Sequence, residues 1–235
     1  MNTYKKTAII AGILFIVATA AALLSTPFLG PINASNYLIS VSANGSQVTT
    51  GALLAFIAAA ASAGIAISLY PVLRKYNEGL ALGAVGFRLI EGVFYIIGVI
   101  GLLLLLTLSR EFVKAGAPDV TYYQTLGALV LAGYHWSGNV GSLLAFCLGA
   151  VMYYYIFYQT RLVPRWLAGW GIIGAAMCMV AGLLVMFRVI GPMSTPQVVL
   201  ALPIAVQEMV LAVWLIVKGF NPSVIAAVSV KPVET

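Results

Sequence analysis

Apolar residues form six long blocks along the chain, and polar residues gather between the blocks. The blocks cover residues 7–29, 49–73, 80–108, 129–158, 166–187 and 197–219. Each is close to or longer than the roughly 20 residues that a helix needs to cross a bilayer. Backbone groups in lipid must be hydrogen-bonded, and barrel strands would show alternation instead of continuous apolar runs. The pattern therefore predicts an all-α bundle of six transmembrane helices.

The basic residues between these blocks orient the bundle. When the N-terminus is placed in the cytoplasm, more of the 12 Lys and Arg residues fall on the inner side than on the outer side. The inner set is Lys5, Lys6, Arg74, Lys75, Arg161, Arg165, Lys218 and Lys231, and the outer set is Arg110, Lys114 and Arg188. This asymmetry follows the positive-inside rule, so both termini are predicted to be cytoplasmic.

The amino-acid composition is that of an integral membrane protein. Hydrophobic residues make up 62% of it and charged residues only 8%, with a mean hydropathy of +1.05. Because a soluble domain keeps about a quarter of its residues charged, this chain cannot cover a water-facing surface. We expect one transmembrane domain over residues 1–235 and no soluble module. The net charge of +6 follows from the topology, and no basic stripe predicts a nucleic-acid partner.

Four ionisable residues lie inside the predicted helices, namely Arg88, Glu91, His135 and Glu208. A charge at mid-bilayer costs about 2.5–3.5 kcal/mol on insertion scales, so it needs a partner. Arg88 and Glu91 are three residues apart and share one helix face. At 1.5 Å per residue, Glu91 and Glu208 lie roughly 17 and 15 Å from the inner ends of their helices. We therefore expect Arg88 to bridge the two glutamates in a polar centre.

Further polar residues are secondary candidates for a site. Tyr95 follows Glu91 by one helical turn, on the face that should point into the bundle. His135, Asn139 and Ser142 form a second polar stripe near the outer end of the fourth helix. His135 and its aromatic neighbours also fit an interfacial belt, and the tyrosines at 153–155 fit a similar belt at the inner side.

The residue set argues against several kinds of chemistry. A zinc site needs several His or Cys ligands, whereas His135 is the only histidine and the two cysteines stand far apart. The motif "HWSGN" is similar to the His-xxx-Asn element of rhomboid proteases, which also need a second histidine. No Walker loop is present, and no GxGxxG follows a strand. We therefore expect no metal and no cofactor, and we assign no catalytic residue.

Three segments carry a resemblance to a known family: "LYPVLRKYNEGLALGAVGFRLIEG" at 69–92, "YQTRLVPRWLAGWG" at 158–171 and "QEMVLAVWLIVKGF" at 207–220. With these, nearly the whole chain resembles the bacterial membrane family catalogued as domain of unknown function 4386. The resemblance implies a multi-pass protein of a bacterial plasma membrane. The pattern of the family includes the charged residues that fall on Arg88, Glu91 and Glu208. It implies no activity.

Three classes of function follow from these observations. The first is a non-enzymatic protein that binds or transports a small molecule or lipid at Arg88, Glu91 and Glu208, and it predicts a cavity that reaches them. The second is a structural or accessory membrane protein in which a sealed cluster only braces the helices. The third is an intramembrane enzyme that uses a glutamate as acid or base. Six helices are few for a transporter, so a transport role predicts a homodimer in the bilayer.

Overall fold

The computed structural model describes residues 3–116 and 120–229. Six helical segments of this part are long and apolar enough to cross a membrane, which confirms the predicted all-α bundle. Five of them are α1 (Thr3–Phe28), α3 (Gly45–Leu73), α4 (Glu78–Lys114), α7 (Arg165–Met186) and α8 (Thr195–Val217). The fourth in chain order consists of α5 (Val120–Trp136), a π-helical segment (Ser137–Ser142) and α6 (Leu143–Thr160).

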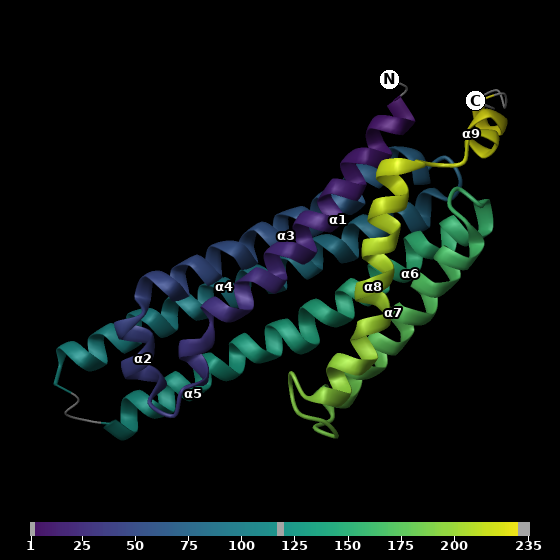
Figure 1. Cartoon of the computed structure of the whole chain (residues 1–235). Coiled ribbons are helices and arrows are strands. Elements are labelled where there is room, and N and C mark those ends of the chain that lie inside the picture. Colours follow the sequence, from purple (N-terminus) through teal and green to yellow (C-terminus); the bar gives the residue numbers. More distant parts are fainter. Residues whose placement is uncertain (1–2, 117–119, 230–235) are drawn as a thin grey trace.

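The beginning of α1 lies at the same end of the bundle as the turns α3–α4 and α6–α7 and the last helix (Figure 1). We call this the inner end, following the predicted orientation, and the opposite end the outer end. The last helix, α9 (Pro222–Ser229), was not predicted from the apolar pattern. Lys231, which contributes to the predicted charge asymmetry, lies outside the described residues.

The helices differ in length, and the difference appears at the outer end. The 37 residues of α4 extend over about 55 Å, whereas the 22 residues of α7 extend over about 33 Å. The outer parts of α3, α4 and α5 therefore reach beyond the α7–α8 turn, and a short helix, α2 (Tyr37–Ala43), packs against them (Figure 1). The Tyr37 hydroxyl donates a hydrogen bond to the Gln124 carbonyl over 3.1 Å. A second hydrophobic cluster fills this outer part, centred on α4 residues such as Leu102 and Leu105.

Local signals in the sequence explain how the inner turns are formed. Asn77 is the N-cap of α4, and its side-chain oxygen accepts a hydrogen bond of 3.0 Å from the backbone N–H of Leu80. Arg161 ends α6 with a left-handed φ of 59°. Pro164 then precedes α7, where its fixed φ suits the start of a helix. These two short turns make α3 and α4, and α6 and α7, neighbours in the bundle.

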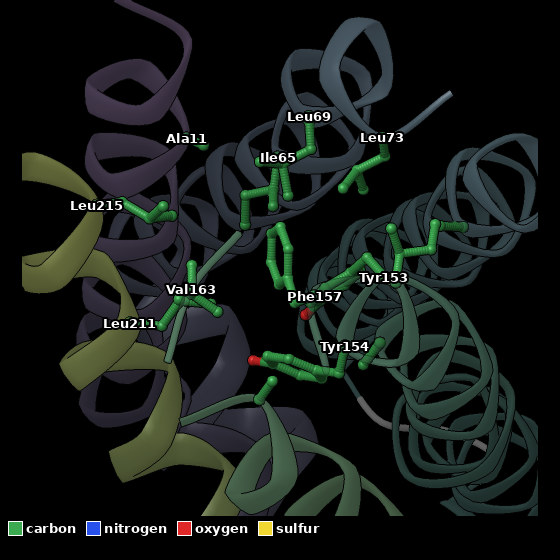
Figure 2. Close-up of a cluster of buried hydrophobic side chains, with 14 of the residues drawn as sticks. Ala11, Ile65, Leu69, Leu73, Tyr153, Tyr154, Phe157, Val163, Leu211 and Leu215 are labelled. Carbon is green, nitrogen blue, oxygen red and sulfur yellow. The ribbon is translucent and has the colours of Figure 1, made fainter. Parts of the chain in front are cut away.

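The main hydrophobic core fills the inner half of the bundle, where α1, α3, α6 and α8 meet (Figure 2). Phe15, Ile65, Phe157 and Leu211 are buried there. Close helix approach depends on small residues. A Cβ added at Gly174 on α7 would lie 2.9 Å from the backbone nitrogen of Ile204 on α8. The core thus holds α8 firmly against α7, just before the α8 segment that carries Glu208.

Candidate functional site

The polar centre is built around the guanidinium of Arg88 on α4. Its Nη1 lies 3.2 Å from Oε2 of Glu91, one turn further along α4, and its Nη2 lies 3.0 Å from Oε1 of Glu208 on α8. Arg88 therefore bridges the two carboxylates, in the arrangement that the helix depths indicated. The forked shape of a guanidinium allows one arginine to hold two acceptors at once. These contacts join α4 to α8 at the middle of the bundle.

Two further residues complete the polar centre, and the sequence reasoning missed both. Arg88 Nη1 donates to the Ser62 hydroxyl on α3 over 2.8 Å, and this hydroxyl donates to Glu91 Oε2 over 2.9 Å. Arg88 Nη2 donates to the Tyr153 hydroxyl on α6 over 2.7 Å, and Tyr153 donates to Glu208 Oε1 over 3.2 Å. The polar centre thus consists of Ser62, Arg88, Glu91, Tyr153 and Glu208, from four helices.

The assignment of Tyr153 and Tyr154 to an interfacial belt was wrong. Both side chains are fully buried and point into the inner core (Figure 2). Tyr154 donates a 2.5 Å hydrogen bond to Gln207, whose amide donates to the Leu167 carbonyl over 2.9 Å. A buried hydroxyl needs a hydrogen-bond partner, and each of these two hydroxyls donates to a side chain of α8. Tyr155, by contrast, is 46% exposed and lies on the side of the bundle that faces away from the core.

Burial makes the charges of the polar centre costly unless they are paired. Arg88 is 2% exposed and Glu91 4% exposed. The guanidinium carbon lies 4.6 Å from the centre of the Phe146 ring and 5.4 Å from that of Tyr153, so aromatic faces of α6 flank the cation. With both carboxylates ionised, two negative charges face one positive charge. The polar centre then has an unbalanced negative charge, which a proton or a cationic ligand would neutralise.

A cavity of about 290 Å³ reaches the polar centre. Its polar lining includes Arg88, Glu91, Tyr95 and Glu208, and its apolar lining comes mainly from α1, α3, α6 and α8. The Glu208 side chain is 12% exposed, so this carboxylate is the most accessible charge of the polar centre. The cluster is therefore not sealed, and the residues predicted from the sequence stand at the wall of a space that a small molecule could occupy.

Several polar atoms in this wall lack a protein partner. Oε1 of Glu91, Oε2 of Glu208 and the Tyr95 hydroxyl form no hydrogen bond within the part of the chain that the structure describes. Each of these three atoms keeps some accessible surface, whereas Nε of Arg88 is fully buried without a partner. Polar groups in such a position are satisfied by water or by a ligand. Two carboxylate oxygens and a phenol therefore face the cavity with free hydrogen-bonding capacity.

A second cavity, of about 620 Å³, lies between the first one and the outer end. It is lined by His135 and Asn139 and by residues of the α7–α8 turn such as Met193, and it shares Ala22, Tyr95 and Gly138 with the inner cavity. The two cavities therefore adjoin each other between the outer end and the polar centre.

The secondary candidates are divided between these two cavities. Tyr95 lines both, His135 and Asn139 line only the outer one, and Ser142 lines only the inner one. Asn139 is fixed by its amide, which donates to the His135 carbonyl over 3.0 Å and accepts from Gln197 over 3.1 Å. His135 therefore stands apart from the Arg88 cluster.

The π-helical segment Ser137–Ser142 lies where the two cavities meet. A π-helical turn widens the helix by an i→i+5 hydrogen bond and occurs frequently at functional sites. The sequence "SGNVGS" offers two glycines here, which was the only signal for an irregular helix. Gly138 presents open backbone to both cavities, since a Cβ added there would meet nothing within 4 Å.

The site offers little to a metal ion. Among residues 3–116 and 120–229, His, Cys, Asp and Glu side chains form no group of three that could hold one. Arg88 already occupies the position between the two carboxylates, so a metal ion cannot bridge them there. Cys147 and Cys178 are buried free thiols on α6 and α7. The chemistry of the site is thus that of carboxylates, a guanidinium and phenols.

Comparison with known protein families identifies a family for this chain. A family model described as "Domain of unknown function (DUF4386)" matches residues 10–219, which is most of the chain and includes all six spans in whole or in large part. No curated protein matches the chain, and no solved structure does.

Proposed function

This chain belongs to the DUF4386 family, and we propose that it is a non-enzymatic membrane protein that binds a small cationic amphiphile at Arg88, Glu91 and Glu208. The observation that carries the proposal is the inner cavity with its unpartnered carboxylate oxygens. A site built only to brace helices would have no need of a cavity at its charged groups.

The charge of the polar centre selects the kind of ligand. One guanidinium and two carboxylates leave an excess of negative charge, and the free oxygens of Glu91 and Glu208 are acceptors. A protonated amine supplies both the missing positive charge and the hydrogen-bond donors. In the low-dielectric interior this pairing is stronger than in water. An anionic ligand would meet the free carboxylates directly and be repelled.

The remaining walls select an apolar body for the ligand. The apolar lining around the polar atoms includes Ala18, Ala22, Ala58, Ile65 and Ile204. The outer cavity gives such a molecule room to enter or leave. We infer that the ligand reaches the site from the outer end, past the π-helical segment where the two cavities meet.

Native mass spectrometry tests this proposal on protein purified in a mild detergent. Glu208→Gln keeps the shape and a hydrogen-bonding oxygen but removes the charge, and Glu111→Gln is the matched control because Glu111 is an exposed carboxylate on α4. We expect wild type and Glu111→Gln to carry a bound species of fixed mass that Glu208→Gln has lost. Three equally bare and equally stable proteins would favour the bracing role instead.

A second measurement asks whether the ligand is a cation. Hexylamine and hexanol have the same apolar chain and differ in charge. We expect hexylamine, but not hexanol, to raise the unfolding temperature of wild type, because a ligand that binds the folded state stabilises it. Glu208→Gln should show no difference between the two compounds. A wild-type protein that responds equally to both would contradict the cationic class.

We also infer that the protein resides in a bacterial plasma membrane with both termini in the cytoplasm. The support is the excess of basic residues in the segments at the inner end. A fluorescent protein that matures only in the cytoplasm, fused after Thr235, is expected to fluoresce. A dark fusion of normal abundance would contradict this orientation.

A further inference from the structure

A third cavity, of about 570 Å³, lies at the inner end, away from the polar centre. It is formed by the α6–α7 turn, at Arg161–Arg165, and by the α8–α9 turn, at Lys218–Pro222. The two turns are tied together by hydrogen bonds from Asn221. Its backbone N–H donates to the Leu162 carbonyl over 2.9 Å, and its amide donates to the Arg161 carbonyl over 3.4 Å. These hydrogen bonds hold together the two turns that form the cavity.

The charged lining of this cavity is entirely basic. Arg161, Arg165 and Lys218 line it, and no carboxylate does. The ion pairs found among the described residues are both in the polar centre, so these three cations have no acidic partner there. Arg165 is held in place by its Nε, which donates to the Tyr158 carbonyl over 3.3 Å, and by the Tyr158 ring. Three positive charges around one cavity are complementary to an anion.

The backbone adds to this positive field. Helix α7 begins at Arg165, on the rim of the cavity, and Pro164 before it provides no side-chain cap. The first N–H groups of a helix lack partners within the helix and carry a partial positive charge. A phosphate oxygen is a usual acceptor for such groups.

Apart from the cations and Asn221, the cavity wall is largely apolar. Leu162, Val163, Trp214 and Phe220 contribute to it. Next to it, Trp166 is 58% exposed and stacks on Trp170 with ring centres 6.5 Å apart. Exposed tryptophans of this kind mark the level of lipid headgroups. A ligand here would have an anionic head among the cations and an apolar part toward the lipid.

We propose that this cavity binds the phosphate headgroup of an anionic phospholipid from the inner leaflet. Arg161, Arg165 and Lys218 hold the phosphate, and Trp214 with its apolar neighbours contacts the glycerol backbone and the first part of the acyl chains. This site is independent of the cationic ligand proposed for the polar centre, since the two cavities share no lining residue.

The test uses the full-length protein in detergent, titrated with phosphatidylglycerol and measured by native mass spectrometry. The variant is Arg161→Asn with Lys218→Gln. Asparagine is chosen because Arg161 has a left-handed backbone, which asparagine tolerates. The matched control is Arg74→Gln with Lys75→Gln, which removes two basic residues at the same end of the molecule but outside the cavity.

We expect phosphatidylglycerol to bind the cavity variant roughly tenfold or more weakly than wild type, because two of the three cations around the phosphate are removed. The control variant should bind as wild type does, and phosphatidylcholine should bind wild type weakly. Equal loss in both variants, or in neither, would overturn the proposal. The unfolding temperatures of all three proteins are compared, so that a folding defect is not taken for loss of a site.

Inorganic phosphate and glycerol phosphate distinguish a lipid from a free anion. If the site is built for a phospholipid, millimolar amounts of either compound should leave phosphatidylglycerol binding unchanged. Full competition at these concentrations would show a site for soluble phosphates, and would overturn the assignment to lipid.

Discussion

The guanidinium of Arg88 on α4 donates a 2.7 Å hydrogen bond to the hydroxyl of Tyr153 on α6, 65 residues further along the chain. This contact gives the buried cation a neutral partner in addition to its two carboxylates. Tyr153 also donates to Glu208, so one phenol links the cation of α4 to the anion of α8. The position of Glu208 in the cavity wall therefore depends on a tyrosine that carries no charge.

Replacing Tyr153 by phenylalanine tests this link. The ring would remain in the core, but Arg88 and Glu208 would each lose a hydrogen bond, so we expect the free energy of unfolding to fall by about 1–3 kcal/mol. Tyr155→Phe is the control. Among the described residues its hydroxyl accepts a hydrogen bond from the exposed Gln159 alone, and its effect should stay within about 0.5 kcal/mol. Denaturant titration in detergent measures both. Equal effects would mean that the buried hydroxyl stabilises nothing.

Removing Arg88 alone should be worse than removing the whole set of charges. Arg88→Leu leaves two carboxylates facing each other without a counter-charge, and breaking a buried ion pair in this way costs about 3–5 kcal/mol. The triple change of Arg88, Glu91 and Glu208 to leucine removes the uncompensated charges, and its loss of stability should be smaller. The same titration compares the two. A triple variant that is less stable than Arg88→Leu would contradict this account of the cluster.

The triple variant also separates binding from bracing. If the cluster is a site, the variant should fold and have no bound ligand in native mass spectrometry. A triple variant that keeps the same bound species as wild type would show that the ligand lies elsewhere.

Close packing of α7 on α8 predicts a second stability difference. Gly174→Ala would place a Cβ 2.9 Å from backbone atoms of α8, which cannot move aside as a side chain could, and should cost about 1–3 kcal/mol. Gly86→Ala on α4 is the control, because nothing lies within 4 Å of its added Cβ. The control should be neutral or stabilising by up to about 1 kcal/mol, since alanine favours helices. The unfolding temperatures of the two variants are compared. A Gly174→Ala protein more stable than Gly86→Ala would be inconsistent with this packing.

The route from the outer end can be tested with a thiol at Gly138. A Cβ added at Gly138 would meet nothing within 4 Å, and Gly138 lines both cavities. A charged maleimide that does not cross membranes should label Gly138→Cys on intact cells if water reaches this point. The control is the same protein without the Gly138 change, and both carry Cys178→Ala, because Cys178 lines the inner cavity whereas Cys147 is fully buried. A Gly138→Cys thiol that reacts only after unfolding in SDS would mean that the route is closed.

The spans and the charged core of the site could be predicted because both depend on strong, local signals. An apolar run of sufficient length has few alternatives to a membrane helix. Arg88, Glu91 and Glu208 were found because a charge in such a run needs a partner, and because helical rise converts sequence position into depth. The contact of Glu208 with Arg88 could be predicted from their similar depth in the membrane, although the two residues are 120 positions apart in the sequence.

Ser62 and Tyr153 could not be found by the same reasoning. Ser62 lies in a run of small residues, where a serine is equally suited to close packing. Tyr153 lies in a run of tyrosines near a predicted interface, where exposed and buried rings have the same sequence pattern. Which helix face points inward is decided by the neighbouring helices, and the angular arrangement of those helices has no local signal. The π-helical turn was missed because hydropathy patterns assume the regular α period.

That turn also sets how the two halves of the fourth span are oriented toward each other. In a regular α-helix each residue turns the chain by about 100°, so the one extra residue of a π-helical turn offsets everything beyond it by about that angle. With this offset, His135 and Asn139 line the outer cavity and Ser142 lines the inner one. The direction in which the side chains of α5 point thus depends on one extra residue in the π-helical turn. Deleting one residue within Ser137–Ser142 would rotate α5 relative to α6 without changing any side chain of α5.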